Sequence, residues 1–359
     1  MSKHKPRSGS KAFYPRKRAR KETPSFKTFP MVSGEKAKPL NFYGYKAGMT
    51  HLMAKDDHQK TTTYGQNIVL NGTLIEVPPV KVFGIRFYSK DVGGIKTLGE
   101  VWAEKKDKHL GKKILGLKAR NKPKKQAFEK SLNKTGHEAQ EGKEKAKEQK
   151  QKKTIADFEK LKQELEEIRL LVHTQPYLTG IGKKKPEVSE IALSGNIEQQ
   201  LEFAKHKLGG EIKIEEVFKE KQFIDVRSVT KGKGFQGPVK RFGVKTSRPK
   251  AKKTRAVGSI SPWHPKTVMW TVARAGQMGY QNRTEYNKRI LIIGNDPASI
   301  NPKSGLPNYG NMKNEFILLA GSVPGPAKRL IALREPIRPV PENKQKISEI
   351  SFISVRDSK

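Results

Sequence analysis

One stretch of the chain constrains its fold and function more than any other, because it contains no acidic residue. Between Val226 and Thr284, 59 consecutive residues include neither Asp nor Glu, although the 359-residue chain has 35 of them. The same stretch holds 14 Lys or Arg residues. Cations at this density repel one another unless a polyanion runs beside them. The sequence therefore predicts a long, irregular nucleic-acid-binding loop at about 227–284, carried by the rest of the chain.

Trp263 lies between two prolines near the middle of this cationic loop, in the cluster Ser261-Pro262-Trp263-His264-Pro265. A Trp in this setting can stack on a nucleobase, an interaction worth roughly 1–3 kcal/mol. It can equally plug the base of a hairpin as part of a core. The residues alone leave both interpretations open. His264 has no acid nearby in the sequence to orient it, so a contact to a base or phosphate is a simpler expectation than a catalytic triad.

Positive charge is concentrated, and this indicates a polyanion as the partner. The chain has 74 Lys or Arg against 35 Asp or Glu, a formal net charge of +39, and residues 1–39 contain 12 basic and 2 acidic side chains. No basic amphipathic helix with a continuous aromatic face is visible, so nucleic acid fits better than a membrane. No apolar run approaches the roughly 20 residues of a membrane span, and no signal peptide is visible. We expect a soluble cytoplasmic protein with no membrane partner and no homo-oligomer.

Nothing in the sequence indicates an enzyme or a metalloprotein. The chain has no cysteine, and its eight histidines lack the spacing of metal ligands. We find no nucleophile with an adjacent base, no paired carboxylates and no P-loop. The expectation is therefore no catalytic residue, no metal and no cofactor.

The segment Gly232-Lys233-Gly234-Phe235-Gln236-Gly237 matches the pattern G-x-G-x-x-G. A dinucleotide fingerprint should open an apolar helix and meet an acidic residue about 20 positions later. Here Pro238 and a basic loop follow, and the first carboxylate is Glu285. We interpret the segment as a Gly-rich turn whose amides and lysines contact phosphates.

Residues 1–39 are predicted to form a basic N-terminal extension with almost nothing to bury. They are rich in Pro, Ser and Lys and include the basic run 16–21. Alone they should be disordered. A solubility tail or an import-like basic patch is one interpretation. The interleaved aromatics Phe13, Tyr14, Phe26 and Phe29 favour an arm that becomes ordered against RNA phosphates.

The remaining residues predict a mainly β fold with an α/β insertion. Residues 40–103 show short strands with Gly and Pro punctuation, at 41–53, 74–77, 80–88 and 99–103, which is typical of a barrel or sandwich. The same β domain resumes in residues 216–359, which contain the loop and expected strands at 223–226, 289–293, 316–320, 329–333 and 347–355. We assign these two segments to one body.

Residues 104–215 are predicted to be the inserted α/β domain. Apolar residues recur every three or four positions within 138–172, which predicts a helix; they are Ile155, Phe158, Leu161, Leu165, Ile168 and Leu171. A second helix should begin after Asn196, with Gln199 completing a capping box, and end at Gly209-Gly210. Residues 188–193 between them predict a strand.

Several phrases together resemble the universal large-subunit ribosomal protein L-three family in its archaeal form. They are Gly44-Tyr45-Lys46-Ala47-Gly48-Met49-Thr50-His51, Phe223-Ile224-Asp225-Val226 with Thr230-Lys231-Gly232-Lys233-Gly234-Phe235-Gln236-Gly237, Trp263-His264-Pro265, and Ala273-Arg274-Ala275-Gly276-Gln277-Met278-Gly279-Tyr280 with Arg283-Thr284-Glu285-Tyr286-Asn287-Lys288. The resemblance runs over most of the chain.

This resemblance implies a six-stranded translation-protein-type β-barrel with an inserted α/β domain, a basic N-terminal extension and a long central loop. It also implies a structural constituent of the large (50S) subunit that binds near the 3′ end of 23S rRNA and nucleates subunit assembly beside neighbouring large-subunit proteins. The loop would reach toward the peptidyl transferase centre with Trp263 at its tip, which favours RNA contact for this residue. Eukaryotic relatives have a methylatable His upstream in the loop, where this chain has Lys250-Ala251-Lys252-Lys253, so that modification is not expected.

The charge pattern and the resemblance together give one set of candidate rRNA-binding residues. They are Arg7, Arg16, Lys17, Arg18, Arg20, Lys231, Lys233, Gln236, Lys240, Arg241, Lys245, Arg248, Lys250, Lys252, Lys253, Arg255, Trp263, His264, Arg274, Gln277 and Arg283. Two other classes of function share part of the pattern. A DNA-compacting architectural protein shares the charge but does not need an irregular loop of this length, and a nucleotide-dependent enzyme shares only the Gly-rich turn.

Overall fold

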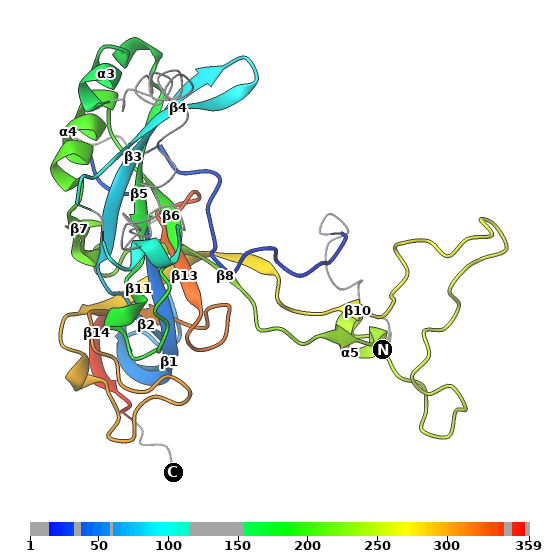
Figure 1. Ribbon diagram of the computed structural model, residues 1–359. Coiled ribbons are helices and arrows are strands. Elements are labelled where there is room, and N and C mark those ends of the chain that lie inside the picture. Colours follow the sequence, from blue (N-terminus) through cyan, green and yellow to red (C-terminus); the bar gives the residue numbers. More distant parts are fainter. Residues whose placement is uncertain are drawn as a thin grey trace, which may run out of the picture.

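The structure is a computed structural model that describes residues 14–31, 37–57, 60–105, 107–114, 154–340 and 347–355. Strands outnumber helices in this part of the chain, so the prediction of a mainly β fold is confirmed. The strands form two main sheets, and a long loop extends away from them (Figure 1).

The larger sheet contains six strands that pair in a closed ring. The strands of this sheet are β1 (Asn41–Asp56), β2 (Asn67–Glu76), β8 (Phe223–Val229), β11 (Asn282–Gly294), β12 (Phe316–Ala320), β13 (Leu330–Arg334) and β14 (Ile347–Ile353). The order β1-β13-β8-β11-β12-β2 returns to β1, and every neighbouring pair is antiparallel. The seventh strand, β14, pairs with the second half of β1. Because the ring closes, none of its six strands has a free edge along its whole length.

The second sheet has the order β4-β3-β5-β6, with β7 paired to β3. Its strands are β3 (Val80–Asp91), β4 (Gly94–Trp102), β5 (Glu167–His173), β6 (Val188–Ala192) and β7 (Glu211–Ile212). Two helices belong to this part of the chain, α3 (Ile155–Glu159) and α4 (Ile197–Lys207), and α5 (Pro238–Phe242) lies in the long loop. The 3₁₀ turns are η2 (Leu110–Lys112), η4 (Lys162–Glu164), η5 (Pro176–Leu178), η6 (Ile214–Glu216) and η7 (Pro297–Ser299).

The first half of β1 joins the two sheets. Its first seven residues are all buried, because one face fills the ring while the other packs on the second sheet. Asn41, fully buried, receives a hydrogen bond from the Ala192 amide at 3.0 Å and donates to the Glu190 carbonyl at 3.0 Å. The Tyr45 hydroxyl donates to Thr174 at 3.0 Å. Because both faces of this half of the strand are buried, residues 41–47 lack the alternation of a half-buried strand.

Several expected elements are confirmed. Helix α4 begins after Asn196, whose amide donates to the Gln199 side chain at 3.1 Å, and the chain leaves the helix through Gly209 at φ +81°. The predicted strands at 188–193, 316–320 and 329–333 match β6, β12 and β13 within one residue. Capping chemistry and glycine stops are local signals, so they survive without knowledge of the tertiary fold.

The predicted helix over 138–172 is wrong beyond Glu159, where α3 ends and a short 3₁₀ turn, η4, follows. Residues 155–159 are helical, and Phe158 stacks on Phe87 at 4.2 Å between ring centroids, but residues 167–173 form β5, between β3 and β6. Ile168, Leu170 and Val172 alternate as a strand requires, and pairing on both sides overrides the helical spacing. Residues 138–153 lie outside the described part of the chain.

The assignment of residues 80–103 to the first part of the β body also differs from the strand pairing. Strands β3 and β4 pair in the second sheet, with β5 and β7, and make no pairing with the ring. Pro78-Pro79 separates β2 from β3, and the missing amide donors of two prolines end the first ladder there. Alternation within a strand does not reveal which sheet it joins, so the sequence could not locate this crossover.

The N-terminal extension contains a buried residue, contrary to the expectation that it has almost nothing to bury. Phe26 is 7% exposed, and the Arg334 guanidinium lies 4.3 Å from its ring centroid. Arg334 also donates to the Thr28 carbonyl at 2.7 Å and pairs with the buried Asp225 carboxylate at 2.6 Å. One guanidinium therefore joins the N-terminal arm, residues 14–31, to strands β8 and β13.

Removing Asp225 should destabilise the isolated protein strongly. The Asp225→Ala variant would leave the Arg334 charge buried without its carboxylate, at a cost of about 3–5 kcal/mol in unfolding free energy. Urea unfolding of the isolated chain measures this loss. The control is Glu166→Ala, at the exposed Lys90–Glu166 pair, which should change stability little. An equal loss in both variants would contradict the role given to the buried pair.

Candidate nucleic-acid interface

The long loop leaves the ring as a continuation of the β8–β11 ladder. Asn282 of β11 pairs with Val229 of β8. Beyond them, the Thr230 amide donates to the Gln281 carbonyl at 3.0 Å, and the Lys233 amide to the Met278 carbonyl at 3.0 Å. The short strands β9 (Phe235–Gln236) and β10 (Gly276–Gln277) extend this stem further. The loop therefore begins on an ordered two-stranded stem of residues 229–237 and 276–282.

Gly279 allows the two sides of the stem to meet. Its φ is +70°, and a Cβ atom at this position would lie 2.1 Å from the Lys231 carbonyl oxygen. No L side chain fits at that distance, and a positive φ adds strain for any residue with a Cβ. The stem geometry thus requires glycine here.

Arg241 closes the outer end of the stem. Its side chain donates from Nε to the Gln277 carbonyl at 3.0 Å and from a terminal nitrogen to the Arg274 carbonyl at 3.0 Å. Because Arg241 is the fourth residue of the five-residue helix α5, these bonds fix α5 against the returning chain. Arg241 was predicted to bind RNA, but two of its donors are engaged inside the loop.

Beyond α5, residues 243–273 contain no helix or strand and are mostly exposed. Trp263 is 83% exposed, and its ring meets His264 edge-on at 6.0 Å. An exposure this high excludes the alternative that Trp263 plugs a hairpin core. The predicted cations Lys245, Arg248, Lys250, Lys252, Lys253 and Arg255 are exposed in the same region.

The described acids of the chain do not neutralise the charge of the loop. Residues 226–284 are all described, and none of their 14 cations forms an ion pair. Asp225 and Glu285, the acids that flank the segment, are paired with Arg334 and Lys288 instead. A segment with this charge and no ion pair to the described acids is suited to bind a polyanion.

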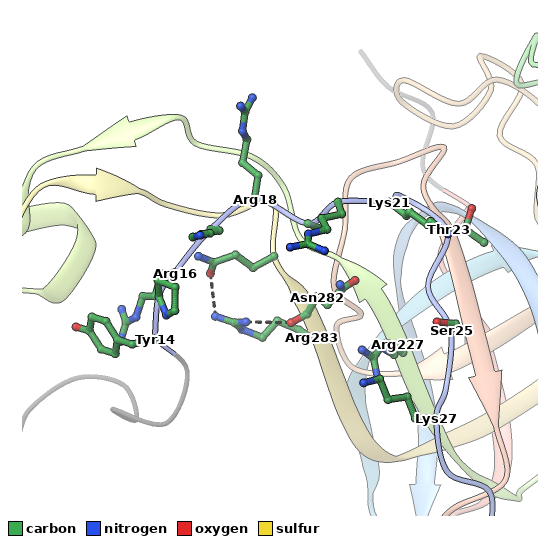
Figure 2. Close-up of a pocket in the computed structure, with 15 residues that line it drawn as sticks. Tyr14, Arg16, Arg18, Lys21, Thr23, Ser25, Lys27, Arg227, Asn282 and Arg283 are labelled. Carbon is green, nitrogen blue, oxygen red and sulfur yellow. Dashed lines mark hydrogen bonds between the residues drawn. The ribbon is translucent and has the colours of Figure 1, made fainter. Parts of the chain in front are cut away.

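The N-terminal arm crosses the stem and adds to the same basic surface. The Ala19 amide donates to the Tyr280 carbonyl at 2.8 Å. Arg16 lies over the ring of Phe242 in α5 at 4.6 Å, and Tyr14 meets Trp270 of the loop edge-on at 5.0 Å. These contacts bring residues more than 200 positions apart in sequence onto one face. Figure 2 shows the arm passing over the stem.

The structure therefore brings most of the predicted residues together, but some of them make hydrogen bonds within the stem. Arg16, Lys17, Arg18 and Arg20 lie on the arm beside Arg283. Lys231, Lys233, Gln236, Lys240, Arg274 and Gln277 lie on or next to the stem, and Gln277 donates to the carbonyls of Met278 and Gly279 at 3.1 Å. Arg7 lies outside the described residues.

Two exposed aromatic residues of this surface, Phe235 and Trp270, were not among the predicted binding residues. Phe235 is 77% exposed on β9, Trp270 is 60% exposed, and Tyr14 packs on Trp270. An aromatic residue within an acid-free, glycine-rich run is itself a signal for base stacking. Phe235 lies in the Gly-rich turn 232–237, which was interpreted from its glycines and lysines alone.

Within the described residues, no group of three His, Cys, Asp or Glu side chains could hold a metal ion. No helix of the described chain has the length and apolarity needed to cross a membrane. The chemistry that this surface offers is electrostatic attraction, hydrogen bonding and stacking.

Comparisons with known proteins identify the same family along the whole chain. A family model described as "Ribosomal protein L3" matches residues 1–356. A protein named "Large ribosomal subunit protein uL3" from Methanocaldococcus jannaschii is 45% identical over 356 residues, 98% of this chain and 96% of that protein. Proteins of the same name are 43% identical in Archaeoglobus fulgidus, over 94% of each chain, and 42% identical in Methanococcus vannielii, over 99% of this chain and 97% of that protein.

Replacing Gly279 should disrupt the stem. In Gly279→Ala, the new methyl group would meet the Lys231 carbonyl, and the strain should cost about 1–2 kcal/mol or more. Amide hydrogen exchange at residues 230–233 should accelerate. The matched control is Gly237→Ala, where a Cβ atom meets nothing within 4 Å and exchange should not change. Unchanged exchange in both variants would show that the stem tolerates a side chain at Gly279.

Proposed function

The chain belongs to the ribosomal protein L3 family, and on that premise we propose that it binds 23S rRNA through its long loop and N-terminal arm. Membership makes it a structural protein of the large ribosomal subunit and not an enzyme. The finer proposal is that it binds near the 3′ end of 23S rRNA and nucleates assembly of the 50S subunit. Its loop, with Trp263 near the tip, would extend toward the peptidyl transferase centre.

One observation carries this proposal: a 59-residue segment with 14 cations forms no ion pair of its own and stands on an ordered stem. Lys and Arg side chains on such a segment can neutralise phosphates, so that RNA helices pack where their own charge would separate them. Exposed Trp263, Trp270 and Phe235 can stack on bases that are splayed out. Sequence readout would be secondary to the shape of the folded RNA.

The architecture supports separate roles for the ring, as a mount, and for the loop and arm, as the RNA-binding segments. We propose that the closed ring is the six-stranded translation-protein-type barrel of the family and serves as a rigid mount. The second sheet with α3 and α4 would be the inserted α/β domain, beginning at Val80 by strand pairing and ending at about residue 215. Residues 1–39 would be the basic extension, and residues from 216 onward would complete the barrel and carry the loop. Neighbouring large-subunit proteins would be partners of the remaining surface.

A DNA-compacting protein is the alternative that shares the charge pattern. It is not favoured, because residues 243–273 have no regular element to follow a duplex groove. Competition between a folded 23S rRNA fragment and duplex DNA of equal phosphate content separates the two functions. Preference for duplex DNA would overturn the proposal.

Neutralising four exposed loop cations should weaken rRNA binding and its salt dependence. Replacing Lys250, Lys252, Lys253 and Arg255 together with Gln removes up to four phosphate contacts. The slope of log affinity against log salt should become less steep by about 3. Filter binding to a 23S rRNA fragment between low and high salt measures it. Replacing four exposed lysines of the second sheet region, Lys90, Lys96, Lys184 and Lys185, is the control. An unchanged slope in the loop variant would count against the proposal.

Removing the Trp263 ring should affect RNA contact and not folding. Because the ring is 83% exposed, Trp263→Ala should leave the melting temperature of the free protein unchanged. If the ring stacks on a base, the variant should lose roughly 1–3 kcal/mol of binding and expose particular bases to chemical probing. Trp263→Phe should restore most of the protection. A lower melting temperature with unaltered base protection would refute the stacking role.

A further inference from the structure

A basic hollow lies where the N-terminal arm crosses the root of the loop. Its volume is about 590 Å³, and its walls are residues 14–21 with Thr23, Ser25 and Lys27 on one side and Arg227 with residues 281–283 on the other (Figure 2). Eight of its lining side chains are Lys or Arg, and none is Asp or Glu. They are Arg16, Lys17, Arg18, Arg20, Lys21, Lys27, Arg227 and Arg283.

Arg227 is the least expected of these cations, because it projects from strand β8 and is only partly exposed. Its Nε is buried and has no hydrogen-bond partner, and Arg227 forms no ion pair with the described residues. A buried donor without an acceptor is unfavourable. Burial, together with the nearby Arg334 charge, lowers the pKa of Arg227 below its usual value.

The other groups around Arg227 are also donors. Lys27 and Ser25 belong to the arm and line the same hollow as Arg227 (Figure 2). Arg283 is held along its strand, donating to the Gln281 side chain at 2.9 Å and to the Asn282 carbonyl at 2.9 Å. Guanidinium, ammonium and hydroxyl donors from two segments therefore converge, and within the described chain no carboxylate lines the hollow. This donor set fits an anion with several acceptor oxygens.

We propose that the hollow binds a backbone phosphate of a single RNA strand, with Arg227 and Lys27 as its principal ligands. The inference rests on the proposed function and adds a specific site, distinct from the distal loop, with two ligands outside the predicted set. A volume of about 590 Å³ is in the range of pockets that hold one small molecule, so the site takes a nucleotide of one strand rather than a duplex. A bound phosphate would supply the hydrogen-bond acceptor that Arg227 lacks. It would also offset the positive charge of the side chains where the arm meets the stem.

The test is Arg227→Gln in the full-length protein, bound to a 23S rRNA fragment. Losing a charge-assisted bond should weaken binding about tenfold, and the log–log salt slope should become less steep by about 0.7–0.9, the value for one phosphate. The melting temperature of the free protein should not fall, since the variant removes an unpaired charge next to Arg334. Arg227→Lys should recover most of the salt slope, and Lys96→Gln on β4 is the control.

Phosphate-ethylation interference gives an independent readout. With the natural protein, ethylation of one phosphate should block binding, and this interference should disappear in Arg227→Gln. If Arg227→Gln binds RNA and shows interference like the natural protein, the inference is overturned. The proposed function would still stand in that case if the four-cation loop variant loses binding. A fall in melting temperature that accounts for the whole loss of binding would also overturn it, because Arg227 would then be structural.

Discussion

The structure depends on one electrostatic constraint: the positive charge of the long loop has no ion-pair partner among the described residues. The nearest acids in sequence, Asp225 and Glu285, stand at the root of the loop and are already paired with Arg334 and Lys288. Mutual repulsion prevents the loop from collapsing into a compact lobe. Order must therefore come from the root, where hydrogen bonds of the β8–β11 ladder continue into the stem. The ring, whose strands are held by an apolar core, fixes the position of that root.

The arm attaches to the stem without any ion pair between its own cations and the described acids. Its described acid, Glu22, accepts from the Tyr280 hydroxyl at 2.9 Å and pairs with Arg329 at 3.2 Å. The remaining attachments are a backbone hydrogen bond from Ala19, ring contacts of Tyr14 and Arg16, and burial of Phe26. Arg18, Arg20 and Lys21 keep their charges open to a partner. Arm and loop thus present one continuous basic surface built from two segments far apart in the sequence.

Much of this arrangement was predictable from the sequence, and the failures have a common cause. Local chemistry located α4 by its cap, β12 and β13 by their apolar runs, and the loop by its missing acids. Residues 167–173 were misassigned because Ile168 and Leu171 continue a spacing of three and four that begins at Ile155, and only pairing with β3 and β6 decides for a strand. Arg227 was passed over as a binding residue for the same reason. Its importance arises from Lys27 and the arm, about 200 residues away in the chain.

The loop joins two strands that are hydrogen-bonded neighbours in the ring, β8 and β11. Residues could be added to it or removed from it without altering ring closure, since the closure entropy of a flexible segment grows only slowly with its length. The distance to which the loop extends and the stability of its support are therefore separate properties of the molecule. The loop could therefore lengthen or shorten during evolution without any change in the ring.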